Sequence, residues 1–295
     1  MKKKVLFVVN PISGSGKYQK IVDTIKQSID KEEFDYKIEL TERQGHAAEL
    51  SEKAVIENYD AVVASGGDGT MHEVAKKLIG TSTALGLLPN GSGNGLARNM
   101  NIPVKLPKAI EALKGFKTVK IDTGIINDEK FIGIAGIGFD AHIAWKFANH
   151  NKRGFQSYIK LSITEYANYF IPDYKIIIDG KEYFKKAFSI TMANSSQFGN
   201  NAIIAPEGSI YDGLIDVCIV KEFPNYAFPE TVIRLFTKTI DKSKYYEVIQ
   251  GKDITIEQQK PYAHLDGEPV EIGKNLHISI NPKSLNVIVP GFSKK

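Results

Sequence analysis

Hydrophobic residues in the first 120 positions form short continuous runs, and each run leads into a polar or glycine-rich turn followed by apolar residues at helical spacing. Continuous runs of this length are typical of strands buried on both faces of a parallel sheet. The expected strands are Val5–Val9, Tyr36–Leu40, the run ending at Ala64, and Ala84–Leu88, and the expected helices contain Ile21, Ile25 and Ile29, then His46–Glu57 and Met71–Ile79. This alternation predicts a three-layer, doubly wound, mostly parallel α/β domain over residues 1–122.

The pattern changes near residue 122 to short segments of alternating polarity, separated by Gly, Asn and Pro. Such segments predict an antiparallel β-rich sandwich or barrel over residues 123–295, whose last residues could return to the first domain. Two helical interruptions are expected, near residues 155–170 and 226–240. The expected strands are Lys130–Ile134, Lys175–Ile178, Ala187–Ala193, Leu214–Val220, Asp253–Glu257, His277–Ile280 and Leu285–Val289.

Composition narrows the classes of protein and of site. Hydrophobic residues make up 42% of the chain and charged residues 24%, as in an ordinary globular protein. The net charge of +4 suits acidic ligands or an anionic membrane surface and does not require nucleic acid. The only cysteine, Cys218, excludes an intrachain disulfide and a multi-cysteine zinc site, which favours the cytoplasm. No apolar run is long enough to predict a transmembrane helix.

The segment Gly66-Gly67-Asp68-Gly69-Thr70 lies between an expected buried strand and an expected helix. Glycines let the backbone approach an anion, and the first N–H groups of a helix point at it with the positive end of the dipole. This turn therefore predicts phosphate binding. Asp68 would repel a phosphate unless it handles a proton or a metal ion, so its presence indicates phosphoryl transfer.

Two further loops follow strands and should meet this turn at the same edge of the sheet. The loop from Asn10 to Lys17 is rich in Gly and Ser but lacks the P-loop spacing, and a simple strand–helix connection explains it equally well. The loop after Leu88 contains Gly91, Ser92, Gly93 and Asn94. Its polar side chains could contact a ligand or only cap a helix.

Two Asp-Gly segments carry the candidate chemistry of the second half. Asp266-Gly267-Glu268 falls between two expected strands, where Glu268 is either a base that reaches a substrate or a solvated residue of a hairpin. Asp212-Gly213-Leu214 could hold a hard cation such as Mg²⁺ or form a plain turn. Asp216, on the strand that follows, is expected to face solvent.

Taken together, these motifs resemble the diacylglycerol kinase catalytic domain family, which includes bacterial diacylglycerol and related lipid kinases and is related to sphingosine and ceramide kinases. The resemblance rests on Asn10-Pro11, Gly66–Thr70, Pro89–Asn94, Gly136–Ala141, Asp212–Asp216 and His264–Glu268, in the order of the family and over nearly the whole chain.

The resemblance implies ATP-dependent phosphorylation of a lipid hydroxyl, such as that of diacylglycerol, in a cleft between the two domains. It implies ATP and Mg²⁺ as cofactors, a lipid substrate at the inner surface of a membrane, and leaves a homodimer open. Glu268 would match the proton acceptor, and Asp68 is also expected to be catalytic. The positions expected to bind the nucleotide are Asn10, Thr41, Gly66, Gly67, Asp68, Gly69, Thr70, Gly91, Ser92, Gly93 and Asn94, and those expected at the metal are Asp212 with the main chain of Ser209 and Leu214.

Three alternatives remain open at this point. The third loop is closer to the Gly-Ser-Gly-Asn of sphingosine kinases than to many bacterial members, so a sphingoid base is the alternative substrate. An NAD kinase would share the Gly66–Thr70 turn, but it should also carry an Asn-Glu pair in its second half. A nucleotide-binding regulator without activity would lack the base.

Aromatic residues recur at helical spacing between Phe155 and Phe170. They could line an acyl chain, with nearby lysines at the head groups, or pack into the core of the second domain.

Overall fold

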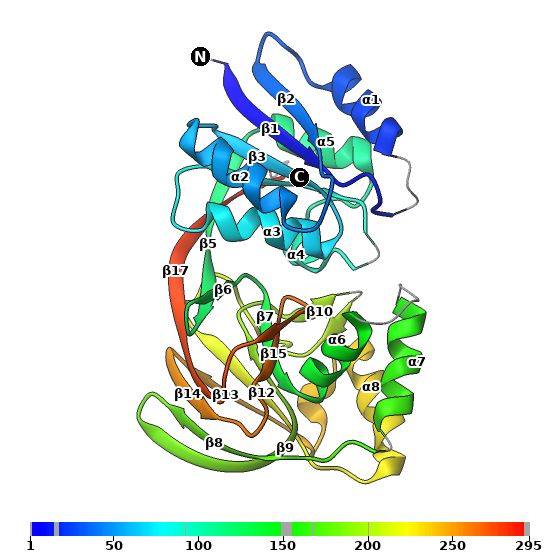
Figure 1. The fold of residues 1–295 in the computed structure, drawn as a ribbon, viewed down its shortest axis with the longest axis vertical. Coiled ribbons are helices and arrows are strands. Elements are labelled where there is room, and N and C mark those ends of the chain that lie inside the picture. The colour runs from blue at the N-terminus through cyan, green and yellow to red at the C-terminus, as the bar shows by residue number, and fades with distance from the viewer. Residues whose placement is uncertain are drawn as a thin grey trace. The chain divides into compact units, whose positions relative to one another are not determined.

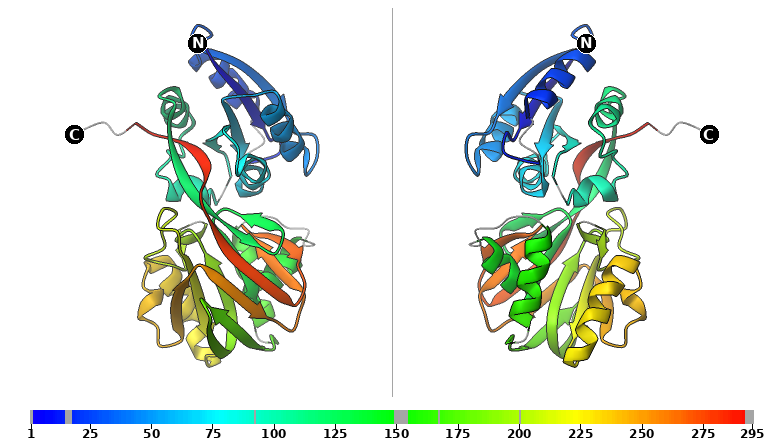
Figure 2. Two further views of the ribbon diagram at one scale, coloured as in Figure 1. Left: turned by 90° about the vertical axis from the view of Figure 1, so that its left-hand side faces the viewer. Right: turned by 90° about the vertical axis from the view of Figure 1, so that its right-hand side faces the viewer.

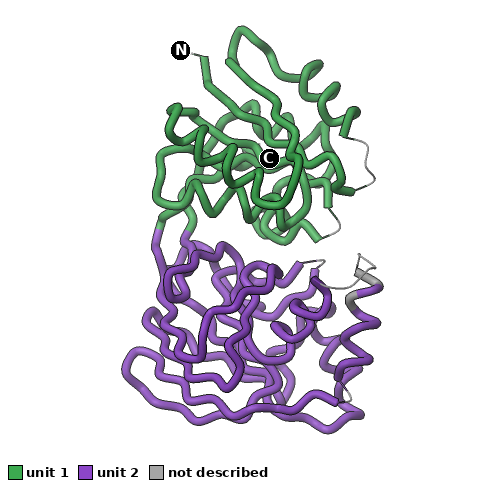
Figure 3. Tube along the Cα trace, in the orientation of Figure 1, with its two compact units in different colours: residues 1–121, 283–295 green, residues 122–282 purple. Residues whose placement is uncertain are grey.

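The computed structural model describes residues 2–14, 18–91, 93–148, 155–166, 168–199 and 201–291. The chain divides into two compact units, coloured separately in Figure 3. Unit 1 consists of residues 1–121 and 283–295, and unit 2 consists of residues 122–282.

Unit 1 is built on a parallel sheet in the order β17-β4-β3-β1-β2 (Figure 1). Its strands are β1 (Lys3–Val9), β2 (Phe34–Leu40), β3 (Ala61–Gly66), β4 (Ala84–Pro89) and the end of β17 (Asn275–Val289). Its helices are α1 (Tyr18–Ser28), α2 (His46–Ile56), α3 (Asp68–Leu78), α4 (Gly95–Asn99) and α5 (Leu106–Lys114).

Helices cover both faces of this sheet. Val5, Phe7 and Val9 of β1 pack in one core with α1 and α5, through residues that include Ile21, Ile25 and Ile110. The intervening strand residues point to the other face, because side chains alternate along a strand, and α2 and α3 pack together there. The three-layer, doubly wound fold expected from the sequence is confirmed.

Unit 2 is an antiparallel β sandwich with helices along one side (Figures 1 and 2). Its strands are the end of β5 (Lys117–Ile126), β6 (Glu129–Phe131), β7 (Ile134–Gly138), β8 (Asp173–Ile178), β9 (Lys181–Ala193), β10 (Gln197–Gly199), β11 (Ala202–Ile203), β12 (Ile215–Lys221), β13 (Tyr246–Gly251), β14 (Asp253–Glu257), β15 (Tyr262–Leu265), β16 (Glu268–Glu271) and the first part of β17. Its helices are α6 (Phe139–Ala148), α7 (Phe155–Tyr166) and α8 (Phe228–Thr237), with short 3-10 turns at Asn225–Ala227 and Ile240–Lys242.

The sandwich forms because the two halves of β9 pair with different strands. Its first half pairs with β8, and its second half pairs with β7 and β12. The alternating apolar residues of these strands meet in one core, which includes Ile137, Ile190 and Val217. The β-rich sandwich expected for the second half is therefore confirmed.

The expected strand Lys130–Ile134 is wrong in its limits. Strand β6 ends at Phe131 and β7 begins at Ile134. Between them, the Asp266 carboxylate accepts the N–H groups of Ile132 and Gly133, at 2.8 and 2.7 Å. A side chain distant in sequence thus replaces the strand ladder at this point.

The two strands expected at the end of the chain are one. Strand β17 runs without a break from Asn275 to Val289, from unit 2 into unit 1, where Val287 pairs with Leu85. Pro282 lies within this strand, because the fixed φ of proline is compatible with extended backbone.

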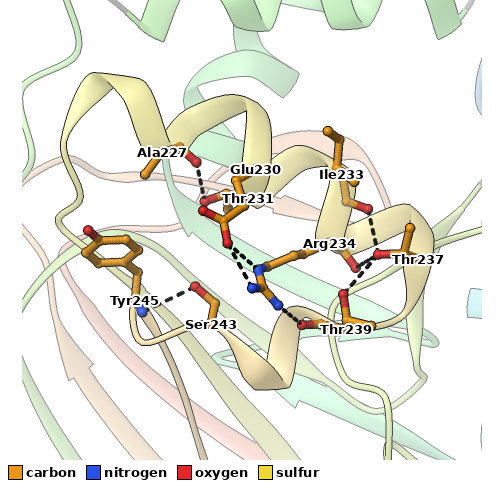
Figure 4. Close-up of polar contacts among 9 residues, drawn as sticks. All are labelled: Ala227, Glu230, Thr231, Ile233, Arg234, Thr237, Thr239, Ser243 and Tyr245. Carbon is orange, nitrogen blue, oxygen red and sulfur yellow. Dashed lines mark hydrogen bonds and ion pairs between the residues drawn. The ribbon is translucent and has the colours of Figure 1, made fainter.

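Helix α8 is held by polar contacts of its own turns (Figure 4). Arg234 donates from Nε to the Glu230 carboxylate at 2.8 Å and from an Nη to the carbonyl of Thr239 at 3.1 Å. Among the described residues, no helix has the length and apolar character needed to cross a membrane.

A charge cluster joins three neighbouring strands of unit 2. The ammonium groups of Lys185 on β9 and Lys221 on β12 lie 3.0 and 2.9 Å from the Glu247 carboxylate on β13. Burial opposes ionisation of Glu247, but the hydrogen bonds from the two lysines outweigh it and hold the pKa of this carboxyl below its usual range.

Because the pKa of Glu247 is lowered by folding, the carboxylate stabilises the protein above its unfolded pKa and ceases to do so as the pH falls through the folded value. We expect Glu247→Gln to reduce the free energy of unfolding by about 1 kcal/mol at pH 7. The difference from the wild type should shrink as the pH falls below about 4 in thermal unfolding measured across pH. The control is Glu222→Gln, since Glu222 pairs with Lys186 and is more exposed than Glu247. A loss of unfolding free energy in Glu247→Gln that does not depend on pH would contradict stabilisation by the ionised carboxylate.

Candidate active site

The three loops of unit 1 that follow β1, β3 and β4 are joined by hydrogen bonds. The Asn10 amide donates to the Thr70 hydroxyl at 3.0 Å, which links the first loop to the start of α3. The Asn90 amide donates to the carbonyl and to the hydroxyl of Ser13, at 3.3 and 3.2 Å, which links the third loop to the first. The expectation that these loops meet at one edge of the sheet is confirmed.

Asp68 ties the second loop to the third. Its carboxylate oxygens accept the backbone N–H groups of Asn94 and Gly95, at 2.9 and 2.6 Å. A side chain on Gly93 would overlap the Asp68 carboxylate, so the loop can approach this closely only with glycine there. The catalytic role of Asp68 stays a prediction. Its contacts also give it a structural role, because they hold the start of α4.

Backbone approaches backbone where Gly67 and Gly91 meet. A Cβ atom on Gly91 would lie 2.6 Å from the Cα atom of Gly67, well inside van der Waals contact. Asn94, in the left-handed conformation, closes the third loop by accepting from the Gly91 N–H at 3.1 Å and donating to the Gly91 carbonyl at 2.8 Å. Its amide is thus used within the loop, and the alternative that the Asn94 side chain caps a helix is wrong, because it makes no capping hydrogen bond to α4.

The start of α3 offers the chemistry of an anion site. The helix begins at Asp68, three residues before the expected start, and its N-cap residue is Gly67, which has no side chain to cap the helix. Its first N–H groups and its dipole therefore favour a negative group. Close-packed glycines and an uncapped helix suit the phosphates of a nucleotide such as ATP.

Thr41 and Ser92 are two further residues expected to contact the nucleotide. Thr41 is buried at the end of β2, and its N–H donates to the carbonyl of Val9 at 2.9 Å. Ser92 lies outside the described residues, as do residues 15–17 of the first loop.

In unit 2, Asp266-Gly267 forms the two-residue turn of the β15–β16 hairpin. Both residues have positive φ, 50° and 91°, as an Asp-Gly hairpin turn requires. Glu268 is the first residue of β16, pairs with Leu265, and has an exposed side chain. The hairpin expected from the sequence is present, and it exposes the Glu268 side chain to solvent.

The loop before β12 provides an oxygen-only set of candidate metal ligands. Asp212 is exposed, and its carboxylate accepts the Leu214 N–H at 3.0 Å, while the Ser209 hydroxyl accepts the Tyr211 N–H at 3.3 Å. No three His, Cys, Asp or Glu side chains converge as a metal site within the described ranges. A Mg²⁺ ion here would use the Asp212 carboxylate, main-chain carbonyls and water, which fits its preference for oxygen.

Two buried carboxylates beside this loop were not anticipated. Asp122 accepts the Gly213 N–H at 2.8 Å and is 1% exposed. The expectation that Asp216 faces solvent is wrong, because it is 6% exposed and accepts from the Gln250 amide at 2.9 Å. Burial raises the pKa of Asp216 despite that hydrogen bond. Their sequence context contains no signal for this burial beyond an apolar strand.

The aromatic residues of α7 and its C-terminal end divide between core and surface. Tyr166 stacks on Phe228 at 4.2 Å between ring centroids, and Tyr169 packs edge-on against Phe139 at 5.0 Å. Ile163 and Phe170 are exposed. The prediction that these aromatic residues pack into the core is therefore confirmed for Tyr166 and Tyr169. The side chains of Phe155 and Tyr158 lie outside the described residues.

Comparison with known proteins bears on both units. Residues 4–126 match the diacylglycerol kinase catalytic domain, and residues 133–289 match the YegS C-terminal NAD kinase beta sandwich-like domain. A protein of Pseudomonas aeruginosa named "Probable lipid kinase YegS-like" is 28% identical over 87% of this chain and 85% of its own. A "Diacylglycerol kinase" of Mycobacterium tuberculosis is 28% identical over 97% of this chain and 95% of its own.

The fold is also that of known structures. A crystal structure from Bacillus anthracis described as a diacylglycerol kinase has a TM-score of 0.74 at 20% identity, over 97% of both chains. A second crystal structure from that organism has a TM-score of 0.81 at 22% identity, also over 97% of both chains. The chain therefore belongs to the diacylglycerol kinase-like lipid kinase family, with a diacylglycerol kinase catalytic domain followed by a YegS-type C-terminal domain.

Proposed function

We propose that this protein transfers the γ-phosphate of ATP to the hydroxyl of diacylglycerol or a similar glycerolipid and forms a phosphatidate-like product. The observation that carries the proposal is the joining of three loops around the uncapped start of α3. Asn10, Asp68 and Asn90 hold these loops together, and the close approach of Gly67 and Gly91 leaves the backbone exposed to an anion.

In this proposal unit 1 binds the nucleotide. The N–H groups at the start of α3 and the glycines of the third loop hold the phosphates, and Asn10, Thr41 and Ser92 are further nucleotide contacts. Mg²⁺ would neutralise phosphate charge as it develops in the transition state. The Asp212 loop, with Ser209 and Leu214, is the proposed place for a structural Mg²⁺.

Glu268 is the proposed base. Phosphoryl transfer to an alcohol needs a group that accepts the hydroxyl proton as the oxygen attacks phosphorus. Its exposed carboxylate, next to the turn of the β15–β16 hairpin, meets that need. Asp68 is the alternative base, but its two hydrogen bonds to backbone N–H groups support a positioning role.

The substrate proposal favours a glycerolipid because the relative of M. tuberculosis carries the name diacylglycerol kinase. A sphingoid base is the alternative, in view of the Gly-Ser-Gly-Asn sequence of the third loop. An NAD kinase remains a further alternative, since the match of the second half is to a domain described as NAD kinase-like in its sandwich.

We also propose that the protein works at a membrane surface in the cytoplasm, where its lipid substrate resides. Helices α7 and α8 of unit 2 present exposed apolar side chains, among them Ile163, Ile233 and Phe236. Exposed lysines lie on or next to the same helices, at Lys160 and Lys238. Apolar and basic groups together suit an anionic bilayer.

The test is transfer of radiolabel from ATP to a panel of acceptors by the wild-type protein. The panel contains diacylglycerol, a monoacylglycerol and sphingosine in anionic and in neutral vesicles, and NAD in solution. We expect labelled phosphatidate, formed faster with anionic vesicles. A labelled sphingoid base would replace the substrate proposal, and labelled NAD without any labelled lipid would refute the function.

A further inference from the structure

A buried polar cluster in unit 2 is not used by the function described so far. Nε2 of His264 on β15 lies 3.3 Å from a carboxylate oxygen of Asp140, at the start of α6. The same carboxylate oxygen accepts the Thr191 hydroxyl of β9 at 3.1 Å. His264 is 3% exposed and Thr191 is fully buried, so these groups interact away from solvent.

The sheet makes room for this cluster at one residue. Gly136 on β7 pairs with His264 on one side and with Thr191 on the other, so the three residues form a row across β15, β7 and β9. A Cβ atom on Gly136 would overlap both His264 Nε2 and the Asp140 carboxylate. The glycine in the middle of the row thus opens the space in which Asp140 and His264 meet.

The hydrogen bond from Gly267 defines which nitrogen of His264 carries the proton. The Gly267 N–H donates to Nδ1 at 3.3 Å, and a backbone N–H is always a donor, so Nδ1 must be unprotonated. Nε2 then carries the hydrogen and faces the Asp140 carboxylate at 3.3 Å. This is the arrangement in which a carboxylate orients an imidazole through one nitrogen while the other nitrogen accepts a hydrogen bond.

Neither group is placed to act on a substrate. The ring nitrogens of His264 are both engaged, and the ring is buried. The Asp140 carboxylate accepts from Thr191, from the Ala141 N–H at 2.8 Å, and faces His264. What the cluster does contact is Gly267, the turn residue that immediately precedes Glu268.

We propose that Asp140 and His264 are positioning residues for Glu268. Asp140 holds His264 in the tautomer whose Nδ1 accepts the Gly267 N–H, and this hydrogen bond sets the geometry of the hairpin tip. Asp266 anchors the other side of the tip by accepting the N–H groups of Ile132, Gly133 and Ile134. The inference rests on the proposed function, since it takes Glu268 as the base.

Two substitutions of His264 separate its contact with Asp140 from its hydrogen bond with Gly267. The amide oxygen of asparagine can take the place of Nδ1, so His264→Asn keeps an acceptor for Gly267 and loses the contact with Asp140. The amide nitrogen of glutamine can take the place of Nε2, so His264→Gln keeps the donor to Asp140 and loses the acceptor. We expect His264→Asn to retain kcat within about threefold and His264→Gln to lose about tenfold to 100-fold, since small misplacements of a catalytic group have effects of this size. The KM for ATP should not change in either variant.

The matched control is a second histidine–aspartate pair at the surface of unit 2. His277 Nε2 lies 2.9 Å from Asp253, and the two side chains are 60% and 71% exposed. His277→Gln and Asp253→Asn should leave kcat unchanged. Activities are compared below the unfolding temperature of the least stable variant, because removal of either buried polar contact reduces stability.

A measurement that does not need activity tests the same geometry. Nitrogen-15 NMR of the histidine ring should show His264 protonated at Nε2 and not at Nδ1 in the wild type. The amide signal of Gly267 should shift in His264→Gln and stay near its wild-type position in His264→Asn. Protonation at Nδ1, equal amide shifts, or an equal loss of kcat in both variants would overturn the inference. If Glu268→Gln keeps full activity, the proposed base fails, and the NMR results still decide whether the cluster holds the hairpin.

Discussion

Replacement of Glu268 by glutamine is expected to remove most of the lipid kinase activity. Loss of a general base typically lowers kcat by about 10²–10⁴-fold, and glutamine has nearly the same shape without the ability to accept the proton. Because the side chain is exposed and the pairing of residue 268 with Leu265 uses the backbone, the fold should be unaffected. The measurement is kcat for transfer of phosphate from ATP to diacylglycerol in vesicles.

The control for this substitution lies on the same strand. Glu271 is also exposed, at the far end of β16, and Glu271→Gln removes the same charge from the hairpin. It should leave kcat within about twofold of the wild type, as expected of a surface carboxylate without a catalytic role. Nucleotide affinity should be equal in both variants and the wild type. A Glu268→Gln protein that retains more than a third of the wild-type kcat would exclude Glu268 as the base and return Asp68 to that role.

Substitution of Gly91 by alanine is expected to disrupt nucleotide binding. The new Cβ would lie 2.6 Å from the Cα atom of Gly67, and neither backbone can yield without moving its loop. The third loop should therefore move away from the start of α3, with a loss of about 100-fold in kcat/KM for ATP. Titration with a fluorescent ATP analogue measures the affinity directly and requires no lipid.

Gly115→Ala provides the comparison within the same unit. Gly115 ends α5 with right-handed helical φ and ψ, and an added Cβ would meet only a carbonyl oxygen at 3.8 Å. Its nucleotide affinity should match the wild type, and its stability should be equal or slightly higher. Unchanged ATP affinity in Gly91→Ala would show that the third loop does not contact the nucleotide.

Local pattern was sufficient to predict most of the secondary structure. Strand β14 has the limits expected from its alternating residues, and the spacing of Ile21 and Ile25 marks the buried face of α1. These elements could be predicted because burial of one face imposes a period on the sequence. The predicted limits of the strand at Lys130–Ile134 were wrong because the contact that interrupts it is not local. The backbone there is bound by Asp266, more than 130 residues away.

In the candidate site, too, local patterns could be predicted and contacts between distant residues could not. Glycine turns after buried strands are visible as local patterns, so the loops of the candidate site and the Asp-Gly hairpin could be predicted. The roles of Asp122, Asp140 and His264 could not, because each depends on a partner from another strand or loop. A buried aspartate and a solvated one can have similar neighbours in the sequence. Asp216 demonstrates this, because it was expected to face solvent and is buried.

The sequence by itself determined the two fold classes, the three loops at one edge of the parallel sheet, and the family. It did so because hydrophobic period and turn residues act over short distances along the chain. Only the tertiary structure decided that Asp68 holds the third loop, that Gly136 opens space for Asp140 and His264, and that this pair reaches the hairpin of Glu268. The physical reason is that hydrogen bonds between distant residues depend on distance and direction in space, and strand register sets both.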